Sequence, residues 1–229
     1  MSARRLIVRQ MELGPMANFV YIIGCGETGE AAVVDPAWDI PAITRAAEQA
    51  QLNIRHALLT HGHPDHMNGV EELLAETDAF VHMHADEVDY MRQVADIFAM
   101  RVDFLERQPG NSRTLGDGAR IDVGNLAVQI IHTPGHTPGS QCFHVEGSLF
   151  SGDTLFVNAC GRVDLPGSDP EKMWWSLNRR LRELPDETVL YPGHNYSERT
   201  TSTIGDEKRS NPYMRIDTPE RFLRVMSIY

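Results

Sequence analysis

The sequence predicts an α/β fold, and three observations support this. Short apolar runs that suit buried strands alternate along the chain with amphipathic runs that suit helices. Histidines and aspartates directly follow several of the apolar runs, and layered α/β folds gather functional side chains at the carboxyl ends of strands. No linker, charge block or low-complexity tract divides the 229 residues, so we expect residues 1–229 to form a single domain.

The first third of the chain predicts an antiparallel meander followed by alternating helices and strands. Asp39 is placed to cap the first helix, and the turn Glu27-Thr28-Gly29-Glu30 separates two strands of the meander. The expected strands are 6–10, 19–23, 31–34 and 56–59, and the expected helices are 41–51 and 67–76.

The segment from residue 80 to residue 107 carries two features that need separate interpretations. Residues 80–84 predict an edge strand that runs into a helix starting near Asp86. The two histidines of this strand and Asp86 imitate a metal motif, but a second adjacent histidine is missing, so we favour a structural role for them.

From 87 to 107 apolar residues recur at helical spacing and predict one or two amphipathic helices. Their methionine and phenylalanine residues would fill the core or a dimer interface, or alternatively line a pocket for an apolar part of a substrate.

The run Thr60-His61-Gly62-His63-Pro64-Asp65-His66 is the strongest functional signal in the sequence. Imidazoles and carboxylates without nearby thiolates favour zinc, iron or manganese. His61 and His63 are two apart on an extended segment and point the same way, whereas Asp65 and His66 turn to a second position as a helix begins. One motif can therefore serve two adjacent metals.

Three later fragments supply further candidate ligands. His136 lies in a Pro-Gly turn after the strand predicted at 126–131, and Asp153 and His194 follow two other short apolar runs. The Asp153 carboxylate is suited to bridging two cations. Each candidate follows a strand, so we expect one rim of ligands.

These motifs, in this order, resemble those of the metallo-β-lactamase superfamily over nearly the whole chain. The resemblance implies an αββα metallo-β-lactamase-type sandwich, with a helical insertion near 86–107. It also implies two metal sites that share Asp153. The first would be held by His61, His63 and His136, and the second by Asp65, His66 and His194.

Within this superfamily the chain is similar to the glyoxalase II-like, or hydroxyacylglutathione hydrolase, branch. The similarity rests on Gly152-Asp153-Thr154-Leu155-Phe156, which leads on to Cys160-Gly161-Arg162. Persulfide dioxygenases share this stretch, and they also share Gly161-Arg162-Val163-Asp164 and the segment from Ser202-Thr203 to Asn211-Pro212.

The resemblance implies a metallo-hydrolase that cleaves a thioester, such as an acylglutathione, with a hydroxide held between two divalent metals. Zinc is favoured, with iron or manganese as alternatives. Asp65 could take up a proton as well as bind metal, and Arg162 would bind a glutathione-linked substrate unless it only pairs with Asp164.

Other functions remain open at this point. A persulfide dioxygenase would use a single Fe(II) on His61, His136 and Asp153. A non-catalytic metal protein and a β-lactam hydrolase are less favoured, because no ligand is missing and no secretion signal is evident.

Composition restricts the partners. The net charge is −11, and Lys and Arg do not cluster in the sequence, so we expect no nucleic-acid partner.

No apolar stretch approaches the roughly 20 residues that span a bilayer, and the first residues do not resemble a signal peptide. Cys25, Cys142 and Cys160 are widely spaced, which suits reduced thiols. We therefore expect a cytoplasmic enzyme without a membrane partner, and a homodimer is compatible with the sequence.

Overall fold

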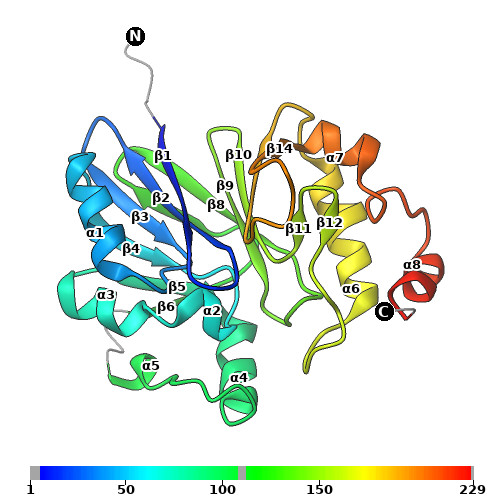
Figure 1. The fold of residues 1–229 in the computed structure, drawn as a ribbon, viewed down its shortest axis with the longest axis horizontal. Coiled ribbons are helices and arrows are strands. Elements are labelled where there is room, and N and C mark those ends of the chain that lie inside the picture. Colours follow the sequence, from blue (N-terminus) through cyan, green and yellow to red (C-terminus); the bar gives the residue numbers. More distant parts are fainter. Residues whose placement is uncertain (1–5, 108–111, 228–229) are drawn as a thin grey trace.

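The computed structural model describes residues 6–107 and 112–227, which form four layers (Figure 1). Two six-stranded sheets pack face to face, and helices cover the outer face of each sheet. The αββα sandwich expected from the sequence is confirmed.

The first sheet has the order β1-β2-β3-β4-β5-β6. Its first three strands are antiparallel and the remaining pairs are parallel. The strands are β1 (Leu6–Leu13), β2 (Asn18–Cys25), β3 (Glu30–Val34), β4 (Asn53–Leu58), β5 (Phe80–His84) and β6 (Ser112–Leu115).

The second sheet has the order β14-β13-β10-β9-β8-β7, and only β10 and β13 pair in parallel. Its strands are β7 (Arg120–Val123), β8 (Leu126–His132), β9 (Gln141–Val145), β10 (Ser148–Gly152), β13 (Val189–Pro192) and β14 (Ser202–Thr203). A separate small hairpin joins β11 (Leu155–Phe156) and β12 (Ala159–Cys160).

The helices fall into two groups along the chain. The first group contains α1 (Ile40–Gln49), α2 (Pro64–Met67), α3 (Val70–Glu76), α4 (Ala85–Val94) and α5 (Phe104–Arg107). The second contains α6 (Pro170–Trp175), which continues through a π-helical turn (Ser176–Arg180) and a 3-10 turn (Leu181–Glu183), then α7 (Ile204–Ser210) and α8 (Pro219–Met226).

The central strands are buried on both faces, because successive side chains enter different cores. On β2, Val20 and Ile22 face the helices of the first group, whereas Phe19, Tyr21 and Ile23 face the second sheet. A third apolar cluster lies between the second sheet and the helices of the second group. Three separate cores therefore bind the four layers together.

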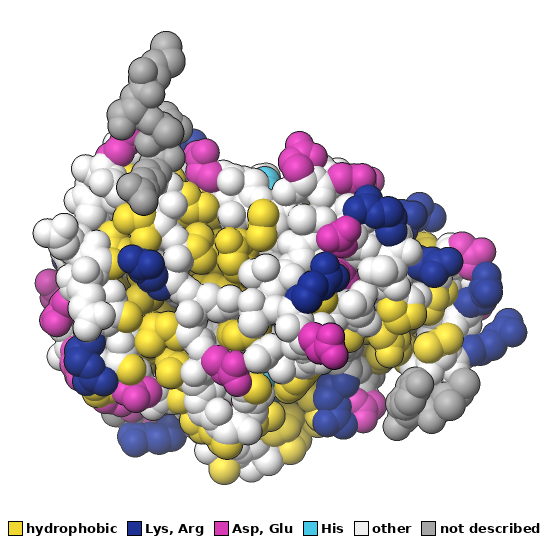
Figure 2. All heavy atoms as spheres, turned by 45° about the horizontal axis from the view of Figure 1, so that its top comes forward, with side chains coloured by type: hydrophobic (Ala, Val, Ile, Leu, Met, Phe, Trp, Pro, Cys, Tyr) yellow, Lys and Arg dark blue, Asp and Glu magenta, His cyan; other side chains and the backbone are white. Residues whose placement is uncertain are grey.

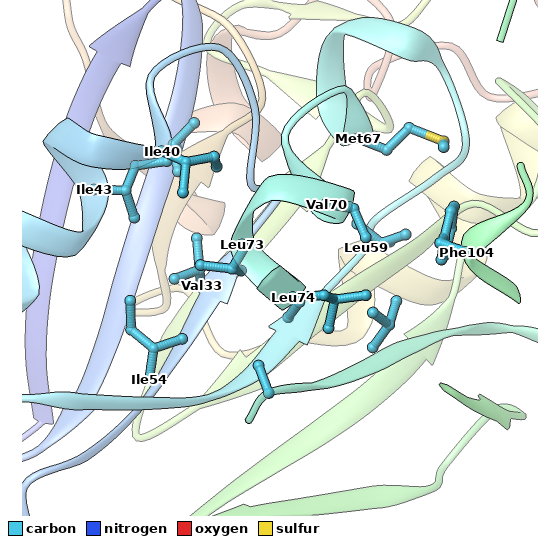
Figure 3. Close-up of a cluster of buried hydrophobic side chains, with 14 of the residues drawn as sticks. Val33, Ile40, Ile43, Ile54, Leu59, Met67, Val70, Leu73, Leu74 and Phe104 are labelled. Carbon is cyan, nitrogen blue, oxygen red and sulfur yellow. The ribbon is translucent and has the colours of Figure 1, made fainter. Parts of the chain in front are cut away.

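The core under the first group of helices brings together residues from distant parts of the chain (Figure 3). Ile40 and Ile43 of α1 and Leu73 and Leu74 of α3 lie around Val33 of β3. These helices fix the loops that follow the strands, where the candidate ligands lie.

Several predicted elements are confirmed and two are wrong. The meander is confirmed, and the 86–107 region contains α4 and α5, joined by an irregular segment. The expected helix at 67–76 begins earlier, at Pro64, and breaks at Asn68-Gly69. A Cβ on Gly69 would lie 2.4 Å from Cδ1 of Ile40 in α1 and 3.0 Å from the Pro36 carbonyl oxygen, so a larger residue there would require Ile40 to move.

The predicted edge position of residues 80–84 is also wrong. β5 pairs in parallel with β4 on one side and with β6 on the other, so β6 forms the edge of the sheet. The assignment of residues 1–229 to one domain, and of 86–107 to an insertion, stays a prediction.

The surface carries mixed charge. Figure 2 shows Lys and Arg side chains gathered toward the end of the molecule that carries α7 and α8. There Lys208 pairs with Asp186, and Arg209 pairs with Asp206. Among the described residues, no helix is long and apolar enough to cross a membrane.

Tyr21 links the two sheets next to the rim that carries the candidate ligands. Its buried hydroxyl donates a hydrogen bond of 2.6 Å to the carbonyl of Pro192, at the end of β13. Burial raises the pKa of Tyr21 well above its ordinary value, so the hydroxyl keeps the proton that it donates.

We predict that Tyr21→Phe lowers the free energy of unfolding by about 1–3 kcal/mol, because the buried Pro192 carbonyl loses its donor. The matched control is Tyr191→Phe, since within the described residues the Tyr191 hydroxyl has no hydrogen-bond partner. Urea unfolding of both variants at equal metal loading measures the difference. Equal losses in the two variants would contradict this role.

Candidate metal centre

All candidate ligands meet at one edge of the sandwich. His61, His63, Asp65 and His66 follow β4, and the remaining three follow β8, β10 and β13, as the sequence predicts. Pro64 begins α2 directly after His63, so the chain turns between the second and third candidates of the motif.

The first group of donors contains His61, His63 and His136. Their ligand atoms lie within 4.8 Å of one another, and all three side chains are buried. His136 Nε2 faces His63 Nδ1 at 2.9 Å. Three imidazoles from two loops therefore converge on one point.

The second group contains Asp65, His66 and His194. His66 Nε2 faces His194 Nε2 at 3.1 Å, and each of these nitrogens lies 3.4 Å from Asp65 Oδ2. The ligand atoms again lie within 4.8 Å of one another.

Asp153 lies between the two groups. Its Oδ2 is 3.6 Å from His136 Nε2 of the first group, and 3.5 Å from His194 Nε2 of the second. Its Oδ1 is 3.4 Å from His66 Nε2. Gly193 permits this position, because a Cβ there would lie 2.5 Å from Asp153 Oδ1.

Unpaired polar atoms indicate that this donor set fits metal ions. Within the described residues, His61 Nε2 and Asp153 Oδ1 are buried without a hydrogen-bond partner. Buried polar atoms are nearly always satisfied, and facing imidazole nitrogens attract each other only when a proton or a cation lies between them. Divalent cations would satisfy both conditions with nitrogen and oxygen ligands.

The nitrogen of each imidazole that points away from the rim has a polar partner. Such contacts fix the ring orientation and the tautomer of a metal-binding histidine. The contacts are His61 Nδ1 to Thr60 Oγ1 at 3.0 Å, His63 Nε2 to the Tyr90 hydroxyl at 3.0 Å, His66 Nδ1 to Asp35 Oδ2 at 2.9 Å, His136 Nδ1 to the Arg162 carbonyl at 2.8 Å, and His194 Nδ1 to the Met16 carbonyl at 2.9 Å.

The electrostatic environment favours neutral imidazoles in the first group. Burial lowers the pKa of His61 well below its ordinary value, and neighbouring imidazoles add to this effect. Burial and the nearby His136 lower the pKa of His63 to about 3. Burial alone would raise the pKa of Asp153, but the imidazoles of His66 and His194 outweigh it and hold that pKa below its usual range. Neutral imidazole and ionised carboxylate are the forms that bind metal.

Sequence reasoning missed Asp35, although it has the same signal as the ligands. It directly follows β3, and it accepts hydrogen bonds of 2.7 Å from both the backbone N–H and the hydroxyl of Thr60. The same carboxylate contacts His66 Nδ1. Asp35 therefore holds the start of the histidine motif in place.

Asn18 was also missed, and no local pattern could have found it. Its amide donates a 2.9 Å hydrogen bond to Asp65 Oδ2, and its own carbonyl accepts one of 3.0 Å from the indole of Trp38. This chain of contacts orients the Asp65 carboxylate.

Glu87 joins the two loops that carry the first donor group. It is buried on α4 and accepts hydrogen bonds from the backbone N–H of Gly62, the hydroxyl of Thr137 and the backbone N–H of Gly139, at 2.7–2.9 Å. Burial raises its pKa to about 7, although these three donors lower it. Its signal in the sequence is an acidic residue followed at helical spacing by the buried Tyr90, Met91 and Val94.

The pocket above the rim has a volume of about 550 Å³. It is lined by five of the candidate ligands, His63, Asp65, His136, Asp153 and His194, together with Cys160, Arg162 and Tyr196. Burial raises the pKa of Cys160 strongly, so its thiol stays protonated. Arg162 is mostly exposed, and it makes two 2.7 Å hydrogen bonds to Asp164.

The histidines of β5 lie outside this rim, as expected. His82 Nε2 contacts His56 Nδ1 at 3.0 Å, and His84 caps α4. His84, Asp86 and His132 do lie close enough to form a separate donor group. However, His84 Nδ1 accepts the hydrogen bond that caps the helix, and its ring stacks flat on His132.

The family model of the metallo-beta-lactamase superfamily matches residues 13–194, so the chain belongs to this superfamily. Two relatives extend the comparison. The chain is 34% identical over 207 residues to the probable polyketide biosynthesis zinc-dependent hydrolase PksB of Bacillus subtilis, with 90% of this chain and 86% of that protein covered. It is 33% identical over 237 residues to a hydroxyacylglutathione hydrolase of Rhodospirillum rubrum, with 89% and 84% covered.

Two solved structures are similar over most of their length. ETHE1 from Myxococcus xanthus has a TM-score of 0.81 and 29% identity, with 96% of this chain and 90% of that chain covered. TTHA1623, solved in a di-iron-bound form, has a TM-score of 0.73 and 32% identity, with 90% and 100% covered.

We predict that Glu87→Gln lowers the affinity for a divalent metal by about 10- to 100-fold. The glutamine oxygen can accept a hydrogen bond from the backbone N–H of Gly62 or from that of Gly139. Its NH₂ group then faces the other backbone N–H, so two donors meet and one hydrogen bond is lost. Competition with a chromophoric chelator measures the affinity. The matched control is Asp89→Asn on the same helix, where the carboxylate is exposed and pairs with Arg92. An unchanged affinity in Glu87→Gln would rule out the positioning role.

Proposed function

We propose that the protein is a metal-dependent hydrolase that cleaves a thioester. The observation that carries this proposal is the position of Asp153 between two complete donor groups, one of three imidazoles and one of two imidazoles and a carboxylate. A shared carboxylate suits two adjacent cations, and two-metal sites are widespread in hydrolytic enzymes.

In this proposal the two donor groups bind the cations, and Asp65 takes up a proton. Two divalent cations held by the groups would supply Lewis acidity and a hydroxide nucleophile at neutral pH. Asp65 lines the pocket, and Asn18 fixes one of its oxygens, so its carboxylate is oriented to take up a proton. Burial opposes ionisation of Asp65, but its contacts with His66 and Asn18 outweigh burial and lower its pKa, so the carboxylate is in the ionised form that binds metal.

The comparisons support a hydrolase and leave the cation open. A zinc-dependent hydrolase and a hydroxyacylglutathione hydrolase are among the relatives, and thioester cleavage suits the second of these names. Zinc is the favoured cation of this proposal, with iron or manganese as alternatives, and the di-iron form of TTHA1623 supports a site for two ions.

A second candidate is a persulfide dioxygenase with one Fe(II). It is favoured by the likeness to ETHE1 and by the arrangement of His61, His136 and Asp153, two histidines and one carboxylate that could share an iron. Under this alternative the second donor group would have no cation to bind, which makes the hydrolase the better explanation of the whole rim.

We expect protein purified anaerobically without added metal to contain close to two metal ions per chain by elemental analysis. In parallel assays of this sample, we expect S-lactoylglutathione to be hydrolysed and glutathione persulfide with dioxygen to give no oxygen uptake. One iron per chain, with oxygen consumption and no thioester cleavage, would contradict the proposal and establish the alternative.

Arg162 tests whether glutathione is the thiol carrier. A glutathione carboxylate at the pocket mouth would have to replace Asp164 as its partner. If it does, Arg162→Ala raises KM for an S-acylglutathione several-fold and changes KM little for the N-acetylcysteamine thioester of the same acid. Equal changes for both substrates would exclude a specific contact with glutathione.

A further inference from the structure

The pocket over the metal rim has an extensive apolar wall. Its volume of about 550 Å³ is typical of small-molecule sites. Beside the candidate ligands, the lining contains six large apolar or aromatic side chains. They are Met16, Trp38, Phe98, Phe156, Leu165 and Tyr196. We call these six residues the apolar wall.

Separate parts of the chain build the apolar wall directly beside the reacting centre. Phe98 follows α4, and its ring lies 5.3 Å from the ring of His63, centroid to centroid. Tyr196 stacks on His194 at 4.6 Å from the other side, and Phe156 packs against both. A substrate group held by this wall would therefore lie next to both donor groups.

Part of the wall is open to solvent. Met16 is 48% exposed and Tyr196 is 59% exposed, and both line the pocket. Sites for small molecules are lined mainly by apolar and aromatic side chains, as this pocket is. The exposed part therefore points to an apolar ligand that covers it.

Two polar side chains of the lining already have hydrogen-bond partners. Among the described lining residues, Arg162 is the single Lys or Arg, and Asp164 binds its guanidinium through two hydrogen bonds. Asn68 accepts a 2.8 Å hydrogen bond from the backbone N–H of Trp38. Away from the ligands, the pocket offers hydrophobic contact rather than charge.

We propose that the apolar wall binds the acyl chain of the substrate and selects thioesters of apolar acids over thioesters of small hydroxy acids. This inference rests on the proposed thioester hydrolysis and names its substrate class. Burial of one methylene group contributes a factor of about four to kcat/KM when the contact is kept in the transition state. An acyl chain that covers the whole apolar wall therefore raises kcat/KM far more than a lactoyl group can.

Phe98 offers a sharp test, because the residue beside it is a natural control. Phe98 lines the pocket and also packs at the edge of the first core, whereas Ile97 is 63% exposed and lies outside the lining. Phe98→Ala removes the ring, Phe98→Leu keeps an apolar side chain, and Ile97→Ala removes a similar apolar area from the surface.

The experiment measures kcat/KM of the metal-loaded protein with N-acetylcysteamine thioesters of straight-chain acids from two to eight carbons, and with the lactoyl thioester. We expect kcat/KM to rise about fourfold for each added methylene until the wall is filled. Phe98→Ala should flatten this slope, while Phe98→Leu and Ile97→Ala should keep most of it. Metal content and Tm of each variant show whether the site is intact.

Each outcome decides between distinct claims. Hydrolysis of the acetyl thioester with no dependence on chain length would overturn the apolar-wall proposal and leave the hydrolase intact. A steep slope that Ile97→Ala and Phe98→Ala flatten equally would also overturn it. If no thioester is cleaved, the proposed function fails. Calorimetry of octanoyl and acetyl thioester binding then tests the apolar-wall proposal separately, and equal affinities for the two thioesters would refute that proposal.

Discussion

The structure depends on holding five imidazoles and two carboxylates face to face in a buried rim. His66 Nε2 and His194 Nε2 are 3.1 Å apart, His136 Nε2 and His63 Nδ1 are 2.9 Å apart, and Asp153 contacts both pairs. Lone pairs at such distances repel unless a proton or a cation lies between them. The metal-binding interpretation explains why a folded protein keeps this arrangement, and it explains why Asp153 Oδ1 is buried without a hydrogen-bond partner.

The packing of the four layers sets the positions of the candidate ligands in this rim. The ligands follow strands of both sheets, so the packing of one sheet on the other sets the distance between the donor groups. Asp35 anchors the start of the histidine motif, and Glu87 joins that motif to the loop of His136. Each anchor is a buried carboxylate that accepts three hydrogen bonds, which is costly to form but leaves the loops little freedom. Asp35 and Glu87 therefore hold the loops that carry the candidate ligands in place.

The sequence placed the candidate ligands together because each lies in a segment that closely follows an apolar strand. Asp35 carries the same signal and could have been included. Asn18 could not be predicted, because it acts by donating a hydrogen bond to Asp65, which lies 47 positions away in the sequence. The break at Asn68-Gly69 was also missed, and there Asn68 accepts a hydrogen bond from the distant Trp38 backbone while Gly69 packs against Ile40 of α1. β6 has too few residues for a clear pattern, so the edge of the sheet was misplaced. Tertiary contacts, rather than local propensity, decide these features.

The account as a whole depends on two cations sharing Asp153, and X-ray anomalous scattering tests this most directly. Crystals of the metal-loaded protein would be measured on both sides of the absorption edge of the bound metal. The account predicts two anomalous peaks about 3.5–4 Å apart, with Asp153 between them. A single peak at His61, His63 and His136, with no density at Asp65, His66 and His194 under metal excess, would contradict it.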